Sequence, residues 1–231
     1  MTGPTHQFNV LPDPNGRAIL NGAAHRPLIL PVVQNAANGS FDGTAADALF
    51  ADPAARQRLI RQIEAFLIAS HSSGAVFDFE NLSTVGQADY VTFLAEAAAL
   101  FDRHGWLTTV AAPVDAQWNL AGVAKVVDRV FLMAYDEHSN DGPPGPIASQ
   151  QWWASKLASA LRQVPREKAI VTLGNYAYDW HDPDKNGAGG DPLNVEEAWL
   201  DAADSDAKPV FDRASGNSSV AYDDEIGRAH V

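Results

Sequence analysis

Short apolar runs alternate along this chain with longer segments of helical periodicity. The apolar runs are rich in β-branched residues and predict buried strands over residues 28–33, 75–80, 106–112, 126–135 and 168–173. Between them, apolar residues recur every three or four positions, which predicts helices over residues 53–71, 86–104, 115–125 and 149–163. Strand and helix in turn, in units of about 30–45 residues, predict βαβ units and a parallel sheet.

Polar and aromatic residues gather directly after several of these strands. This pattern is typical of the carboxyl-terminal face of a (β/α)₈ TIM barrel, where active sites lie. An open, doubly wound sheet is the alternative, but no Gly-x-Gly-x-x-Gly or phosphate-binding lysine loop follows any strand. We therefore predict an α/β fold of the TIM-barrel type. The residues after three of the strands are Gln34 and Asn35, Glu80 and Asn81, and Tyr135 and Asp136.

The two ends of the chain depart from the βα rhythm. Residues 1–26 are rich in Pro, Gly and Asn without a clear period, and we expect them to be irregular. After residue 180 a Gly/Asp-rich loop precedes a short helix from Asn194 and two short strands, at 210–212 and 219–223. We predict a partial barrel over residues 1–180 and a small α+β insertion over residues 181–231. Because only five strand candidates are convincing, we expect a barrel that is incomplete at both ends and a chain that is a fragment.

Composition limits the partners of the chain. Its 231 residues are 46% hydrophobic, which is enough for one sizeable core. The formal net charge of −13 argues against nucleic acid and anionic membranes, and it is compatible with a neutral sugar polymer. The absence of cysteine excludes disulfides and cysteine-based zinc sites.

Neither a metal nor a cofactor is expected. His138 follows two acids, but one His with two adjacent acids is poor zinc spacing. Asp182, Asp184, Asn186 and Asp191 lack the ordered alternation and the terminal Glu of an EF-hand calcium loop.

The stretch from Gly74 to Asn81 places two carboxylates on an apolar strand. Side chains alternate between the faces of a strand, so Val76, Asp78 and Glu80 share one face. Buried carboxylates are costly unless they are paired, hydrogen-bonded or reached by solvent. From these residues alone two interpretations stay open: solvated acids at a strand end, and a catalytic pair.

Three motifs, in order along the chain, carry a resemblance to a known family. The stretch Ser73-Gly74-Ala75-Val76-Phe77-Asp78-Phe79-Glu80 matches half of the signature Asp-x-x-Asp-x-Asp-x-Glu. Met133-Ala134-Tyr135-Asp136 matches Met-x-Tyr-Asp in full, and Tyr176-Ala177-Tyr178-Asp179-Trp180 is similar to Tyr-Gly-Tyr-Asp-Trp. With these motifs the chain resembles the family-18 glycoside hydrolases, which are chitinase-like (β/α)₈ barrels, and above all their spore-germination branch.

The resemblance implies an O-glycosyl hydrolase with a retaining, substrate-assisted mechanism. Glu80 would be the general acid, and the nucleophile would be the acetamido carbonyl of the substrate rather than a second protein carboxylate. Asp78 would orient the acetamido N–H, Tyr135 would bind its carbonyl, and Asp136 would contact the same sugar. A general acid must hold its proton near neutral pH, which a desolvated position beside another carboxylate favours.

The resemblance also implies partners and a location. The substrate would be an N-acetylglucosamine-containing glycan, chitin-like or peptidoglycan-like. Fusion to polysaccharide deacetylase and glycosyltransferase domains would place the protein outside the cytoplasm, at a bacterial cell envelope. Further sugar contacts would come from Gln34, Asn35, Tyr176, Tyr178 and Trp180.

The chain departs from the family signature at two acids. Ser73 and Val76 stand where the first and second Asp are expected. In the family, the acid at the position of Asp78 shares a hydrogen bond with the acid at the position of Val76, and a valine cannot form this bond. The alternative to an enzyme is therefore a catalytically inactive barrel that binds envelope polysaccharide.

Overall fold

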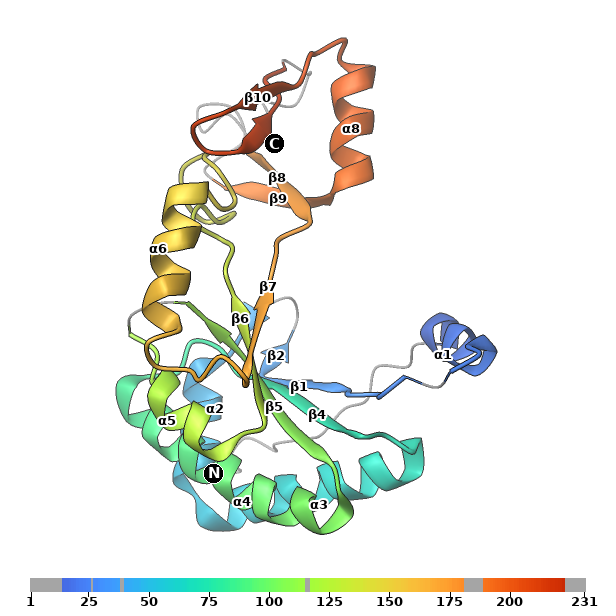
Figure 1. Cartoon of the computed structure of the whole chain (residues 1–231), viewed down its shortest axis with the longest axis vertical. Helices are drawn as coiled ribbons and strands as arrows, with labels where there is room; N and C mark the ends of the chain where they lie inside the picture. Colours follow the sequence, from blue (N-terminus) through green and yellow to red (C-terminus); the bar gives the residue numbers. More distant parts are fainter. Residues whose placement is uncertain (1–13, 26, 38–39, 115–116, 181–188, 223–231) are drawn as a thin grey trace, which may run out of the picture. The chain divides into compact units, whose positions relative to one another are not determined.

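The computed structural model describes residues 14–25, 27–37, 40–114, 117–180 and 189–222 (Figure 1). Helices and strands alternate along most of this length. No described helix is long and apolar enough to cross a bilayer. The helices are α1 Pro14–Gly22, α2 Gly43–Ala51, α3 Pro53–Ser70, α4 Thr84–His104, α5 Leu120–Val126, α6 Gln150–Ala160 and α8 Val195–Asp204. The strands are β1 Val32–Gln34, β2 Ala36–Ala37, β3 Ser40–Phe41, β4 Gly74–Asp78, β5 Leu107–Pro113, β6 Arg129–Met133, β7 Ala169–Thr172, β8 Tyr176–Trp180, β9 Gly190–Asn194, β10 Val210–Asp212 and β11 Asn217–Ser219.

A five-stranded sheet with the order β1-β4-β5-β6-β7 confirms the predicted barrel type in partial form. Neighbours in sequence are neighbours in the sheet, as successive βα units require. Strand β4 pairs in parallel with β1 on one side and with β5 on the other. The predicted strand over residues 28–33 is shifted, because the regular strand β1 begins only at Val32, after Pro31.

The chain divides into two compact units, and each is described by itself. Unit 1 holds residues 1–131 and 161–170, and unit 2 holds residues 132–160 and 171–231. In unit 1, helices α2 to α5 lie along one side of strands β1, β4 and β5 (Figure 1).

The core of unit 1 is an aromatic cluster beneath strand β4. Phe77 is fully buried, with its ring 5.3 Å from that of Phe93 and 6.0 Å from that of Phe101, both on α4. Phe79 packs edge-on against Phe50 of α2, at 5.0 Å between ring centroids. Edge-to-face pairs of this kind add to the free energy of burial. The residues of β4 that point toward the helices are therefore fixed by packing.

Helix ends follow the local signals in the sequence. Asp52 caps α3 with a side-chain hydrogen bond to the amide of Ala54, and Pro53 fills the first turn. Gly105 ends α4 in the left-handed conformation that glycine adopts readily at a helix end. Asn194 and Glu197 form a reciprocal capping box at the start of α8.

Two helices were not predicted. Residues 14–22 form α1 within the segment predicted to be irregular, and residues 43–51 form α2, although a loop was predicted over residues 36–44 and no element over residues 45–51. The sequence Gly-Thr-Ala-Ala-Asp-Ala-Leu-Phe-Ala is short, and its starting glycine reads as a loop signal. Asp42 nevertheless caps this helix through the amide of Ala45, and Phe50 anchors it in the aromatic cluster.

Two antiparallel strand pairs of unit 2 depart in part from the sequence prediction. Strand β8 follows β7 as a separate strand. It pairs antiparallel with β9. Strands β10 and β11 form the predicted antiparallel pair, with the second strand two residues earlier than expected. The predicted domain boundary at residue 181 stays a prediction, and residues 181–188, with much of the loop weighed above as a calcium site, lie outside the described residues.

Removing the Phe77 ring tests the aromatic core. Phe77→Ala should lower the free energy of unfolding by about 3–5 kcal/mol, because the ring is fully buried among other rings. Val85→Ala, at a side chain that is 74% exposed on α4, is the control and should change it by less than about 0.5 kcal/mol. Urea denaturation of the two variants measures both values, and equal values would contradict the account.

Candidate functional site

The residues predicted to act on substrate fall into two groups, one in each unit. In unit 1, Val76, Asp78 and Glu80 are half-buried, whereas Phe77 and Phe79 between them are buried on the helix side. The predicted alternation of faces is therefore confirmed. Strand β4 ends at Asp78, so Glu80 lies two residues beyond the strand rather than within it.

Asp78 occupies an electrostatically unfavourable position. Burial raises the pKa of its carboxyl above the ordinary value. Within the described residues its Oδ1 atom is buried and has no hydrogen-bond partner. Such an unsatisfied acceptor is uncommon in a folded protein and marks a place where a ligand donor would be favourable.

The side chain of Asn35 makes two hydrogen bonds to the main chain of Glu80. Its Nδ2 atom donates to the Glu80 carbonyl oxygen at 2.9 Å, and its Oδ1 atom accepts from the Glu80 amide at 2.9 Å. Asn35 follows β1 and Glu80 follows β4, and these adjacent parallel strands bring both residues to the same edge. The two hydrogen bonds from the Asn35 side chain thus take the place of backbone pairing after the end of β4. They fix the direction in which the chain leaves the sheet at Glu80.

A second contact fixes the residue after Glu80. Asn81 has a φ of 59°, and its side chain donates to the Phe41 carbonyl at 3.2 Å. A Cβ atom on Gly43 would lie 1.8 Å from the Asn81 carbonyl oxygen, so only glycine fits there. Sequence reasoning missed this contact, because nothing in the local pattern links Gly43 to a residue 38 positions away.

Gln34 lies beside Asp78 in the parallel register of β1 and β4. Its side chain is exposed. The structure therefore brings together four of the predicted residues in unit 1, namely Gln34, Asn35, Asp78 and Glu80. The roles assigned to them stay predictions.

In unit 2, aromatic residues surround the carboxylate of Asp136. Asp136 follows β6 with a left-handed backbone, at a φ of 63°. The hydroxyls of Tyr176 and Tyr178 both donate to its Oδ1 atom, Tyr178 at 3.0 Å. The ring of Tyr135 stands edge-on to that of Tyr176, at 5.8 Å between centroids.

The two tyrosines are held in their protonated form. Burial, reinforced by the nearby Asp136 carboxylate, raises the pKa of Tyr176 and of Tyr178 well above the ordinary value. Both hydroxyls therefore remain hydrogen-bond donors to Asp136 across the physiological pH range. Both tyrosine hydroxyls therefore hold Asp136 through its Oδ1 atom.

Trp180 differs from the other predicted sugar contacts. Its indole is 2% exposed, packs against the Tyr178 ring at 5.4 Å, and donates from Nε1 to the Ser139 carbonyl at 3.4 Å. These contacts favour a supporting role behind Tyr178. Among the described residues, no group of three or more His, Asp and Glu side chains is arranged to hold a metal ion.

Comparison with known proteins assigns these features to one family. The sequence model of "Glycosyl hydrolases family 18" matches residues 36–228. Over 97% of the chain, the sequence is 25% identical to YdhD of Bacillus subtilis, a candidate sporulation-specific glycosylase. It is 26% identical over 87% of the chain to a cortical fragment-lytic enzyme of the same organism.

Solved structures agree on the fold. The crystal structure of YdhD superposes with a TM-score of 0.84, covering 96% of this chain and 76% of that one. A chitinase from Chromobacterium violaceum superposes with a TM-score of 0.82 at 22% identity, covering 97% of this chain and 72% of that one. The chain spans 57% of the length of YdhD and 49% of that of the cortical fragment-lytic enzyme. On the family match and these motifs together, the chain belongs to glycosyl hydrolase family 18.

Proposed function

We propose that this chain carries the catalytic strands of a retaining glycoside hydrolase that cleaves N-acetylglucosamine-containing glycans, with Glu80 as the general acid. The observation that carries the proposal is the arrangement at the end of β4. Asp78 and Glu80 share the face that is not packed on helices, and Asn35 holds the Glu80 main chain in both directions. Family membership supplies the reaction class.

The proposed reaction proceeds in two steps. Glu80 gives its proton to the glycosidic oxygen while the acetamido carbonyl oxygen of the substrate attacks the anomeric carbon, so that the glycosidic bond breaks and a cyclic oxazolinium forms. Water then attacks the same carbon from the side opposite the acetamido oxygen, the bond between that oxygen and the anomeric carbon breaks, and the water gives a proton to Glu80. The acetamido group and the protonated Glu80 are thereby restored. Two displacements restore the original anomeric configuration.

Asp78 is proposed to bind the acetamido group of the substrate. Its unpaired, buried Oδ1 atom would accept the acetamido N–H, and this hydrogen bond would compensate for the burial of the carboxyl. Tyr135 and Asp136 belong to unit 2, and their roles as a donor to an acetamido carbonyl and as a sugar contact are proposed from the family motif that they carry. The tyrosine hydroxyls on the Oδ1 atom of Asp136 leave its other oxygen for that contact.

The relatives suggest the kind of glycan. One is named a cortical fragment-lytic enzyme and another a chitinase, so we propose a peptidoglycan-like or chitin-like polymer as substrate. We also propose that the protein acts at a cell envelope, since such polymers are found there. Fusion to deacetylase and glycosyltransferase domains remains a prediction.

A second candidate function rests on Val76. This residue replaces the acid that would share a hydrogen bond with Asp78, and within the described residues the Asp78 Oδ1 atom has no hydrogen-bond partner. A barrel with a weakened acid pair could bind polysaccharide without cleaving it.

Replacing Glu80 tests the proposed function directly. Glu80→Gln should lower turnover of a labelled chito-oligosaccharide or peptidoglycan fragment by at least about 100-fold, because the glutamine cannot donate a proton to the leaving group. Binding should persist. Glu64→Gln is the control, because Glu64 pairs with His104 at the helix surface, at 2.8 Å. No turnover by the unmodified protein, with saturable binding in both forms, would establish the binding function instead.

Asn35 should behave as a positioning residue. Asn35→Ala removes both hydrogen bonds to the Glu80 main chain, and it should lower kcat by about 10- to 100-fold with little change in KM. Asn35→Asp keeps the acceptor for the Glu80 amide and should recover part of kcat. A raised KM with unchanged kcat would instead show direct contact with substrate, the behaviour that we predict for Gln34→Ala.

Asp78→Asn should stabilise the fold while it removes activity. The folded-state pKa of Asp78 is raised, so the folded protein loses stability as the pH rises from the ordinary value of 3.8 through that higher pKa. Asparagine carries no charge and avoids this loss. The gain in free energy of unfolding should thus be absent in acid and appear as the pH rises. Urea denaturation over a pH series measures it, and a gain that is equal at every pH would overturn the explanation.

A further inference from the structure

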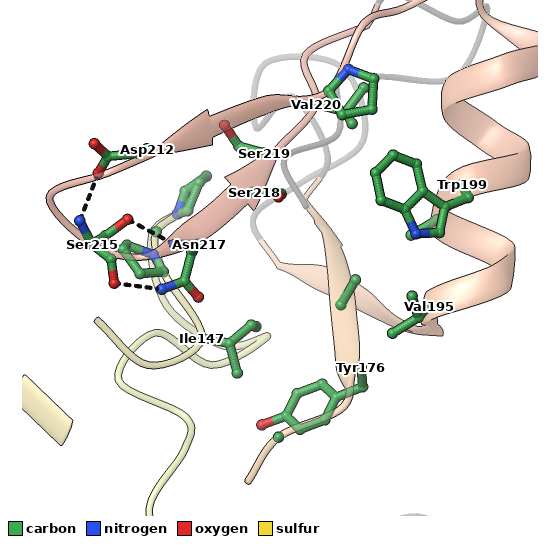
Figure 2. Close-up of a pocket in the computed structure, with 17 residues that line it drawn as sticks. Ile147, Tyr176, Val195, Trp199, Asp212, Ser215, Asn217, Ser218, Ser219 and Val220 are labelled. Carbon is green, nitrogen blue, oxygen red and sulfur yellow. Dashed lines mark hydrogen bonds between the residues drawn. The ribbon is translucent and has the colours of Figure 1, made fainter. Parts of the chain in front are cut away.

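Unit 2 contains a cavity, and among its described lining residues only Tyr176 has a role assigned above. Its volume is about 590 Å³, within the range of pockets that hold small ligands. Helix α8 forms one wall, the hairpin of β10 and β11 another, and the loop over residues 144–147 and the start of β8 complete it (Figure 2).

An aromatic and aliphatic surface lines much of this cavity. Trp199 lines it from α8, and its indole is 52% exposed (Figure 2). Ile147 and Val220 contribute aliphatic surface. A large, exposed tryptophan in a concave site is costly to leave in water and offers a flat face to a ring of the ligand.

Polar residues of β11 line the same cavity. The Asn217 side chain donates from Nδ2 to the carbonyl oxygens of Ala148 and Ser215, at 2.9 and 3.0 Å, so the orientation of its amide is fixed. In the described part of the chain, the Asn217 Oδ1 atom and the hydroxyls of Ser218 and Ser219 have no hydrogen-bond partner. The cavity thus presents both donors and an acceptor.

The charge of the described lining disfavours anionic ligands. Among the described residues that line the cavity, no side chain is basic and Asp212 is the one acid. The Asp212 carboxylate accepts from the amides of Ala214 and Ser215, both at 3.0 Å, and therefore serves the turn of the hairpin. A phosphate or a nucleic acid would find no counter-charge here.

We propose that this cavity is a separate saccharide-binding site, in which one or two uncharged sugar units of the glycan stack on Trp199 and hydrogen-bond to Asn217 and to the hydroxyl of Ser218 or Ser219. A sugar ring has an apolar face and a rim of hydroxyls, which matches an aromatic wall opposite uncharged polar groups. The ligand class rests on the proposed function. Because the Tyr176 ring also lines the cavity and its hydroxyl binds Asp136, a bound sugar would rest against the residue that anchors that carboxylate.

The test is calorimetric binding of N-acetylglucosamine oligomers of two to six units, in the Glu80→Gln background so that no ligand is consumed. Trp199→Ala should weaken binding of the longest oligomers by roughly fivefold to tenfold, with less effect on the dimer. Trp199→Phe should keep part of the affinity. Trp152→Ala is the control, because Trp152 lies on α6 outside the cavity and its ring faces the Lys156 ammonium.

Unchanged binding in Trp199→Ala, with the parent protein binding normally, would overturn this inference and leave the proposed function standing. No binding and no hydrolysis of any glycan by the unmodified protein would overturn both. If Trp199→Ala does not fold, the indole N–H signal of Trp199 in the Glu80→Gln protein decides the matter. That signal should shift during titration with the hexamer, and no shift at saturation would contradict the site.

Discussion

Phe77 and Phe79 pack into the aromatic cluster beneath the sheet, and this packing determines which way the neighbouring side chains point. Because side chains alternate along a strand, Asp78 and Glu80 must then face the opposite side. A slip of one residue would bury both carboxylates among phenylalanine rings, at a cost that the fold could not tolerate. The same rings that stabilise unit 1 therefore specify where its chemistry can occur.

Without a bound substrate, the buried carboxyl of Asp78 lowers the stability of the fold. Asp78 is partly buried, its Oδ1 atom has no hydrogen-bond partner in the part of the chain that the structure describes, and burial raises its pKa. Beyond the end of the strand, Asn35 and the Gly43–Asn81 contact hold the main chain around Glu80. In unit 2, Asp136 is likewise anchored by neighbouring hydroxyls. Asp78 Oδ1 and the second carboxylate oxygen of Asp136 are therefore the acceptors that we propose for a ligand.

Much of this could be predicted from the sequence, for identifiable reasons. Apolar, β-branched runs marked the strands of the main sheet, and Asp78 and Glu80 stood out because carboxylates are rare on such a strand. Helix α2 was missed because its nine residues begin at a glycine, and its stability comes from Phe50 packing with distant rings. The Gly43–Asn81 contact and the cavity at Trp199 depend on residues far apart in the chain. The local sequence pattern therefore predicts neither the contact nor the cavity.

The central claim is that the substrate's own acetamido group acts as nucleophile beside Asp78, with Glu80 as acid. The most direct measurement is the configuration of the new reducing end, observed by proton NMR in the first minutes of hydrolysis of a β-linked N-acetylglucosamine oligomer. Two displacements at one carbon predict that the β-anomer forms first and then mutarotates. Initial formation of the α-anomer would show a single displacement by water and would contradict the account.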